Sequence, residues 1–290
     1  MFDPIYKITV YGLPKIWNIE QNECIIFAEM NQHRFRYLVR LQYLGFRYSG
    51  WQIQPKQRTV EAMLNKTFTF LYPDVEYKIL GAGRTDAKVS SLDGAFELFL
   101  AQELENLNLF LMEFNKNLPP DIRLLSIEPK QGDFNIIKDS KTKEYLYLFS
   151  YGQKNHPFSA PFISNYTDYL DLERMKMGAM LFEGTHDFSV YTAELKPNTK
   201  TLRHIDSCYI EENNLLKANF FPEKSFILKI RGKGFIRYQI RMIMGALVQL
   251  GKNELTLAEI EASLKSGSGL KLKTIAPGSG LLLNQISFKG

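Results

Sequence analysis

The chain has 290 residues, of which 45% are hydrophobic and 23% charged, and its net charge of +5 is compatible with a polyanionic partner without requiring one. A chain of this length can bury one large core or fold into two lobes. The sequence has no disulfide framework and no zinc site of recognisable spacing, because its two cysteines, Cys24 and Cys208, are isolated and its four histidines are scattered. No apolar run approaches the roughly 20 residues of a transmembrane helix, and the N-terminus MFDPIYKITV lacks a signal-peptide pattern, so we expect a cytoplasmic protein without a membrane partner.

Residues 1–33 contain no recognisable motif, and we treat them as an N-terminal extension of unknown role. A strand is predicted over residues 33–43, where apolar residues alternate with residues that are mostly basic. The basic face carries Arg34, Arg36 and Arg40. Such a face is either simply solvated or lines an RNA cleft, where phosphates favour Lys and Arg, and the pattern leaves both interpretations open.

Two glycines shape the next segment, YLGFRYSGWQIQP. Gly45 and Gly50 are predicted to make turns, and we expect Trp51 to pack at the base of a loop rather than to stack on a nucleotide. Thr59 then caps a helix with one buried face. The apolar positions of that face are Val60, Met63, Leu64, Phe68 and Leu71.

Residues 81–94, GAGRTDAKVSSLDG, form a predicted loop between two strands. The strand before the loop alternates over residues 75–79, and the strand after it, AFELFL, is rich in strand formers. Arg84 and Asp86 lie at the tip of the loop. Taken alone, this pair favours the ordinary interpretation of a turn-forming carboxylate beside a solvated arginine.

A second helix is predicted around residues 104–114, and NLPPDIRLLSI is typical of a proline-marked turn into a strand. Residues 129–141 hold turn-forming and charged residues and indicate a passage between two lobes. The next strand, residues 142–150, alternates again. One of its faces carries Lys143, Tyr145, Tyr147 and Phe149, and tyrosines so placed most often pack in a core.

The C-terminal part repeats the succession of helices and strands, which is consistent with two similar lobes. A helix is predicted over residues 171–182, followed by strands in KTLRHI and FILKIR. In GKGFIRYQIRMIMGALVQLG the apolar residues keep helical spacing from Ile236 to Leu250, so we predict a long helix that ends at Gly251. Arg237 and Arg241 lie one turn apart beside this stripe, where arginines are ordinarily surface charges.

Four stretches in this order resemble the signature of the TruA-type tRNA pseudouridine synthases: GRTDA, Lys-x-Tyr-x-Tyr, FIRxxIR and the terminal APGSGLLL. The resemblance covers roughly residues 35–290. It implies an α+β pseudouridine synthase fold, with two similar lobes whose mixed or antiparallel sheets are flanked by helices and with an RNA-binding cleft between them. We assign residues 34–135 to an N-terminal lobe with the catalytic loop and residues 136–290 to a C-terminal lobe.

The resemblance also implies roles for single residues. In the family the aspartate of GRTDA is the catalytic nucleophile, here Asp86, and the arginine that matches Arg241 pairs with it, which would hold the pKa of the carboxyl down. Arg84 matches the residue that enters the RNA helix as the target base leaves it, and Tyr145 would stack on the extruded uracil. Isomerising uridine to pseudouridine involves neither redox chemistry nor net hydrolysis, so we expect no cofactor and no metal.

We expect further RNA contacts from four basic residues, Lys88, Arg36, Arg40 and Arg237. The family modifies the anticodon stem-loop of tRNA as a homodimer, and we expect tRNA as the partner and a homodimer here. The chain departs from the family pattern at two positions, Lys88, where the family commonly has Gly, and Ser90, where it commonly has His. If the first position needs a positive φ, lysine there implies a changed loop.

These departures keep alternatives open. The chain is either an active tRNA pseudouridine synthase, or an enzyme of this kind that acts on another RNA, or a catalytically silent RNA-binding module. An unrelated α+β enzyme with a basic surface is a further alternative, and it would show no salt-dependent affinity for RNA.

Overall fold

The computed structural model describes residues 35–193, 195, 198–272 and 274–289. The predicted N-terminal extension, residues 1–33, lies outside the described residues. Within the described ranges, no helix is long and apolar enough to cross a bilayer.

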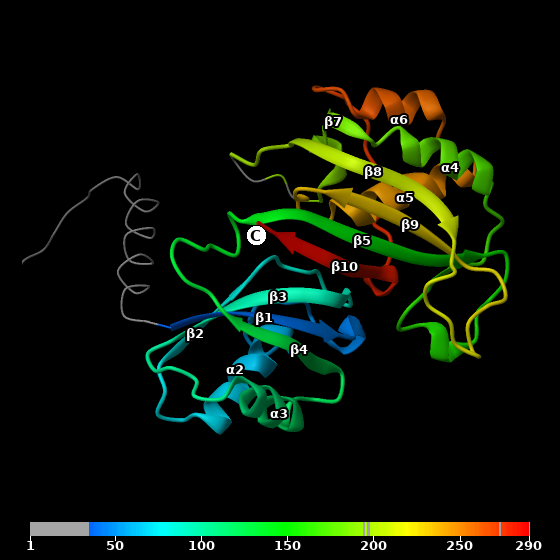
Figure 1. Ribbon diagram of the computed structural model, residues 1–290. Helices are drawn as coiled ribbons and strands as arrows, with labels where there is room; N and C mark the ends of the chain where they lie inside the picture. The colour runs from blue at the N-terminus through cyan, green and yellow to red at the C-terminus, as the bar shows by residue number, and fades with distance from the viewer. Residues whose placement is uncertain (1–34, 194, 196–197, 273, 290) are drawn as a thin grey trace, which may run out of the picture.

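The described strands form one ten-stranded mixed sheet (Figure 1). Hydrogen-bonded neighbours follow the order β4-β1-β3-β10-β5-β9-β8-β7, while β2 pairs with β3 and β6 with β5. The strands are β1 (Phe35–Tyr43), β2 (Tyr77–Gly81), β3 (Ser90–Leu100), β4 (Ile122–Pro129), β5 (Ser140–Tyr151), β6 (Ser164–Tyr166), β7 (Gly184–Asp187), β8 (Leu202–Glu212), β9 (Phe226–Gly232) and β10 (Leu281–Phe288). The predicted α+β class is confirmed.

Two helices cover the N-terminal half of the sheet, α2 (Val60–Leu71) and α3 (Leu107–Asn117) (Figure 1). Helix α2 begins where the sequence predicts, because the Thr59 hydroxyl accepts a hydrogen bond from the backbone N–H of Ala62 at 3.3 Å. Phe68 and Phe114 of these helices pack at 6.2 Å between ring centroids. Burial of such aromatic side chains is the main stabilising term for this half.

Three helices accompany the C-terminal half: α4 (Leu172–Met180), α5 (Gln239–Gly251) and α6 (Leu257–Ser263). Every residue of α5 is buried except Arg241, so this helix is the core of the half. Helix α4 lies close against it because Gly178 has no side chain; a Cβ there would lie 2.4 Å from Leu250 Cδ2. The one residue of α5 that is not fully buried is therefore the arginine that the sequence assigned to the site.

The C-terminal strand β10 joins the two halves of the sheet (Figure 1). It pairs antiparallel with β5 over most of its length and parallel with β3 through Leu282 and Leu283. The predicted lobe boundary at residues 135 and 136 falls in the connection between β4 and β5. Because the sheet runs without a break across that boundary, the division into two lobes stays a prediction.

The helices of the two halves lie on opposite faces of the sheet. On β1, Val39 packs in the cluster that contains α2 and α3, whereas Leu38 points to the other face and shares a cluster with Leu283. Tyr145 of β5 packs against that second cluster and also against the core beneath α5. The sheet therefore has one continuous face that α5 covers in the C-terminal half and that α2 and α3 do not cover in the N-terminal half.

Two predicted boundaries differ from the structure. The loop predicted over residues 81–94 spans only residues 82–89, because β3 begins at Ser90, which is paired with Leu282 of β10. The long helix does end at Gly251, but it begins only at Gln239, because Tyr238 has a left-handed φ of 65° that interrupts helical geometry. Neither boundary is visible in the sequence pattern. Pairing with β10 sets the start of β3, and the backbone angle of Tyr238 sets the start of α5.

Candidate active site

A cavity of about 870 Å³ opens beside residues 82–89, which we call the GRTDA loop. Six segments line it: the GRTDA loop, β5, the N-terminal end of α5 with the residues before it, the connection from β1 to α2, the connection from β7 to β8 through Thr192 and Thr199, and the start of β10 at Leu281. Five of the residues predicted for the site line the cavity: Arg84, Asp86, Tyr145, Arg237 and Arg241. Lys88, Arg36 and Arg40, also predicted for the site, do not line it.

The backbone of the GRTDA loop is held by close contacts with glycines from three other segments. A Cβ on Gly45 would lie 1.9 Å from Val89 O, on Gly50 it would lie 2.6 Å from Thr85 O, and on Gly278 it would lie 2.3 Å from Ala87 O. No side chain fits at these distances, so each position requires glycine. Gly45 and Gly50 of YLGFRYSGWQIQP and Gly278 of APGSGLLL are far apart in sequence. They therefore share one role, which is to let the chain approach the GRTDA loop closely.

Hydrogen bonds fix the same loop. Trp51 N donates to Thr85 O at 3.1 Å, and the hydroxyls of Tyr43 and Thr85 lie 2.8 Å apart. The Trp51 ring is only 5% exposed and occupies the space beside Gly81, where a Cβ would lie 2.6 Å from the ring. The prediction that Trp51 packs at the loop base is confirmed.

Lys88 and Ser90, the two residues that depart from the family pattern, both make contacts with residues 45–48. Lys88 has a φ of 66°, the left-handed conformation that glycine adopts most readily, and whether the loop differs from that of the family stays a prediction. Its backbone N–H donates to Tyr48 O at 3.0 Å, and its ammonium lies 5.6 Å from the Phe46 ring centroid. Ser90 is buried, and its hydroxyl accepts a hydrogen bond from Gly45 N at 2.9 Å.

Asp86 forms an ion pair with Arg241 across the cavity. The distance from Arg241 Nη1 to Asp86 Oδ2 is 3.2 Å, and the two side chains are 15% and 19% exposed, respectively. Arg241 is itself held by a second bond, because its Nε donates to Ala276 O at 2.7 Å. Helix α5 and the segment before β10 thus fix the guanidinium, and the guanidinium orients the carboxylate.

The electrostatics of Asp86 differ from the expectation. Burial raises the pKa of its carboxyl above the ordinary value, and the nearby charges of Arg241 and Arg237 offset only part of that rise. The prediction that Arg241 lowers the pKa holds for its own contribution, but desolvation outweighs it. A carboxylate that is poorly solvated and held by a single hydrogen bond is a more reactive nucleophile than a solvated one.

Tyr238 organises the two arginines before and within α5. The guanidinium carbons of Arg237 and Arg241 lie 4.9 and 5.2 Å from the Tyr238 ring centroid. Because Tyr238 interrupts the helix, Arg237 lies outside α5, not one turn before Arg241 on the same helix. Stacking on an aromatic ring restricts both cations at the cavity wall.

Tyr145 lies opposite α5 on the β5 wall. Its ring meets Phe235 edge to face at 5.5 Å, and burial together with the charge of Asp86 raises the pKa of its phenol far above the ordinary value. A raised pKa leaves little of the phenol ionised near neutral pH, which favours a packing role over proton abstraction. Tyr147, on the same strand face, is fully buried and bonds Ser164 and the Pro277 carbonyl, so it is a structural residue.

Several cavity residues were not assigned to the site from the sequence. Lys143 and Phe235 line the cavity, as do Ser49 and Gln52 from the connection between β1 and α2. A signal for Lys143 was present, because it lies two residues before Tyr145 on the same strand face. Gln52 also carried a signal, because Gly50, Trp51 and Gln52 resemble the family's Gly-Trp-Gln element, whereas Ser49 is brought to the cavity only by the fold.

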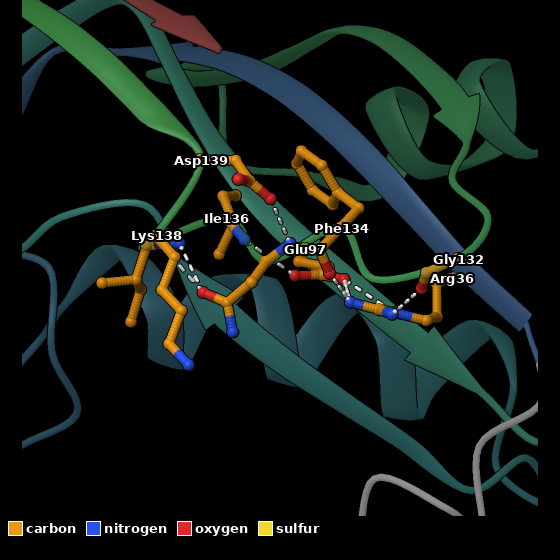
Figure 2. A network of polar contacts seen from close by, with 9 residues as sticks. Arg36, Glu97, Gly132, Phe134, Ile136, Lys138 and Asp139 are labelled. Atoms are coloured by element: carbon orange, nitrogen blue, oxygen red, sulfur yellow. Dashed lines mark hydrogen bonds and ion pairs between the residues drawn. The ribbon is translucent and has the colours of Figure 1, made fainter. Parts of the chain in front are cut away.

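Arg36 and Arg40 are on the predicted strand but have internal partners. Arg36 Nε donates to Glu97 Oε1 at 2.9 Å and Arg36 Nη1 donates to Gly132 O at 3.0 Å (Figure 2). Arg40 Nη1 pairs with Asp93 at 2.8 Å, and its guanidinium lies over the Phe288 ring. The two arginines are therefore not simply solvated, and their contact with RNA stays a prediction.

Comparison with known proteins agrees with this geometry. The sequence model of a family described as "tRNA pseudouridine synthase" matches residues 179–289. A tRNA pseudouridine synthase A from Mesoplasma florum is 34% identical over 262 residues, covering 88% of this chain and 99% of that protein. A protein of the same name from Mycoplasma genitalium is 31% identical and covers 83% of this chain and 98% of its own length.

The relatives span almost the whole described chain and therefore include the GRTDA loop, β5 and α5. A further tRNA pseudouridine synthase A, from Thermodesulfovibrio yellowstonii, is 29% identical over 86% of this chain and 97% of its own. This extent of similarity excludes an unrelated α+β enzyme with a basic surface. The chain belongs to the tRNA pseudouridine synthase family.

Proposed function

We propose that the protein isomerises uridine to pseudouridine in tRNA and that Asp86 is the nucleophile. The observation that carries this proposal is the Asp86–Arg241 pair at 3.2 Å, placed on the wall of an 870 Å³ cavity with Tyr145 on another wall. The reaction breaks the bond from N1 to the sugar and forms a bond from C5 to the same sugar carbon, while C5 loses its proton and N1 gains one, so that no atom is gained or lost. The carboxylate of Asp86 attacks the nucleoside, and Arg241 keeps it oriented throughout.

The substrate base enters the cavity only after it leaves the RNA stack, which costs roughly a few kcal/mol. Arg84 is exposed at the edge of the cavity, two residues before Asp86, and is the group that takes the place of the departing base. Tyr145 then packs against the uracil, with Phe235 supporting its ring from the edge. Because Tyr145 remains protonated, it serves as a packing surface and a hydrogen-bond donor.

Basic residues around the opening provide phosphate contacts. Arg237 lines the cavity, and Lys88 is exposed on the GRTDA loop. Arg36 and Arg40 contribute to the positive potential of the sheet face, while their guanidinium groups remain bound to Glu97 and Asp93. We assign direct phosphate contact first to Lys88 and Arg237.

The finer assignments follow the family. The target is a uridine of the tRNA anticodon stem-loop, the enzyme acts as a homodimer in the cytoplasm, and the chain divides into lobes at residues 34–135 and 136–290. These assignments rest on the resemblance of the four sequence motifs to the family. A dimer places a second copy of the basic surface within reach of the same tRNA.

The test is to incubate the protein with unmodified total tRNA and map pseudouridine by chemical-adduct primer extension. We expect new stops in the anticodon arm with the wild type and none with Asp86→Ala or Asp86→Asn, while both variants still bind tRNA. Asp93→Asn, which alters a carboxylate outside the cavity, is the matched control and should retain the stops. If the wild type binds tRNA and leaves no stops in any RNA, the protein is a silent RNA-binding module.

A further inference from the structure

Lys143 is a partly buried cation on the wall of the active cavity, and the catalytic assignments above do not use it. It lies on β5, two residues before Tyr145 and on the same strand face, so the two Cα atoms are about 7 Å apart. Its ammonium donates to Ala82 O at 2.8 Å, at the point where β2 leads into the GRTDA loop. The side chain therefore joins the strand that carries Tyr145 to the loop that carries Asp86.

The loop sequence leaves space for this ammonium. A Cβ on Gly83 would lie 2.9 Å from Lys143 Nζ, closer than such atoms approach each other in proteins. Gly83 has no positive φ, so its backbone does not require glycine. A side chain at position 83 would therefore displace the Lys143 ammonium from its present place against the loop.

Within the part of the chain that the structure describes, no carboxylate forms an ion pair with Lys143, whereas Asp86 is paired with Arg241. Burial accordingly lowers the pKa of the Lys143 ammonium. An ammonium has three N–H donors, and the Ala82 carbonyl uses one of them.

We propose that Lys143 binds a phosphate that borders the target uridine when the nucleotide occupies the cavity. This proposal rests on the proposed function and names one further contact of the same site. Of the parts of a flipped uridine, only the flanking phosphodiesters carry a formal negative charge, so they are the groups that match this buried cation. If the base packs against Tyr145, Lys143 lies about 7 Å away along the same strand face. That separation is similar to the distance from a base to the phosphates of its own nucleotide.

The test removes the two charges one at a time and then together. Once the target uridine has been mapped, two tRNAs are made with a neutral methylphosphonate at the phosphate on its 5′ or on its 3′ side. Single-turnover kcat/KM is measured for the wild type and Lys143→Gln on each RNA. We expect one of the two methylphosphonates to lower kcat/KM of the wild type by about 10- to 100-fold, and Lys143→Gln to lower kcat/KM on natural tRNA by a similar factor. Lys143→Gln acting on that methylphosphonate tRNA should show little further loss, because both changes remove the same contact.

Two further variants separate this role from a purely structural one. Lys141→Gln removes an exposed lysine of the same strand and should leave the effect of the methylphosphonate unchanged. Gly83→Ala keeps the lysine but displaces its ammonium, and it should reproduce part of the loss on natural tRNA and weaken the methylphosphonate effect. Thermal unfolding of each variant shows that it is folded.

The proposal is overturned if the losses from Lys143→Gln and from both methylphosphonates multiply, because the lysine and the phosphates then act independently. It is also overturned if Lys143→Gln lowers the melting temperature and leaves kcat/KM unchanged, which would make the lysine a structural residue only. Because wild-type activity on natural tRNA is measured first, failure of the underlying function is seen separately.

Discussion

Two arginine–carboxylate pairs of this protein use the same chemistry for different purposes. Arg36 and Glu97 lie beneath the connection from β4 to β5, and Arg241 and Asp86 lie at the cavity. In both pairs burial raises the pKa of the carboxyl and the arginine offsets part of the rise. The shared pattern of a partly buried arginine beside a carboxylate does not by itself distinguish them.

The pairs differ in how completely the carboxylate is bonded. Glu97 is fully buried and accepts hydrogen bonds from Arg36 and from Ile136 N, while Arg36 also donates to Gly132 O and Phe134 O (Figure 2). Asp86 has one arginine bond and lies beside open space. The fully hydrogen-bonded Arg36–Glu97 pair holds the connection between β4 and β5 in place. In the Arg241–Asp86 pair, one carboxylate oxygen has no hydrogen bond from the described residues and lies beside the cavity, where it can react with a substrate.

The largest expected effect comes from breaking the cavity pair. Arg241→Met should lower kcat/KM by roughly 10⁴-fold, or about 5.5 kcal/mol, because Asp86 loses both its orienting bond and the main charge that favours its ionised form. Single-turnover assays on tRNA measure the loss, and tRNA binding serves as the control for folding. A loss of less than tenfold would show that Arg241 does not position the nucleophile.

Breaking the Arg36–Glu97 pair should instead reduce stability. Arg36→Met leaves the buried Glu97 charge with only the Ile136 N–H, and we expect the free energy of unfolding to fall by about 3–5 kcal/mol. Glu97→Gln should cost less, because the raised pKa indicates that the neutral side chain is tolerated there. Urea titration measures both, and kcat/KM of the folded fraction should change little.

The same variant gives a pH dependence of stability with a definite sign. A carboxyl whose pKa is raised in the folded state favours folding in its protonated form, so its contribution is present at low pH and is lost as pH rises through the folded pKa. Removing Arg36 raises that pKa further. The stability deficit of Arg36→Met should therefore be largest near neutral pH and shrink on acidification; a deficit that is independent of pH would contradict this account.

A smaller effect is expected on the pH–rate profile. Because Asp86 must be ionised to act and burial raises its pKa, the acid limb of kcat/KM should lie above the ordinary aspartate value of 3.8. Arg237→Gln removes the weaker of the two opposing charges and should shift the limb to higher pH. A shift to lower pH would show that Arg237 acts on another group.

The smallest effect concerns Lys88, whose φ of 66° is unfavourable for a residue with a side chain. Lys88→Gly should raise the free energy of unfolding by roughly 0.5–1 kcal/mol, because glycine adopts this conformation without strain. Loss of the charge should reduce the salt dependence of tRNA binding by about one counterion. Thermal unfolding and binding at several salt concentrations test both, and unchanged stability would mean that the loop carries no strain.

Sequence reasoning found the five residues whose motifs are distinctive and missed those whose role comes from the fold. Asp86, Arg84, Tyr145, Arg237 and Arg241 all line the cavity. Arg36 and Arg40 were grouped with them because they share a basic strand face, and strand alternation cannot reveal that Glu97 and Asp93 face them from β3. The start of α5 was misplaced because helical spacing continues through Tyr238 although its φ does not.

The sequence by itself determined where α2 begins, and four short motifs indicated the family, its α+β class and the GRTDA loop through resemblance, because capping residues and short motifs are local properties of the chain. Only the tertiary structure decided that Gly45, Gly50 and Gly278 close on that loop from three segments, that β10 joins the two halves, and that burial outweighs Arg241 in setting the pKa of Asp86. Those outcomes depend on which groups are brought together and on how much water is excluded between them, and neither quantity is contained in a local pattern.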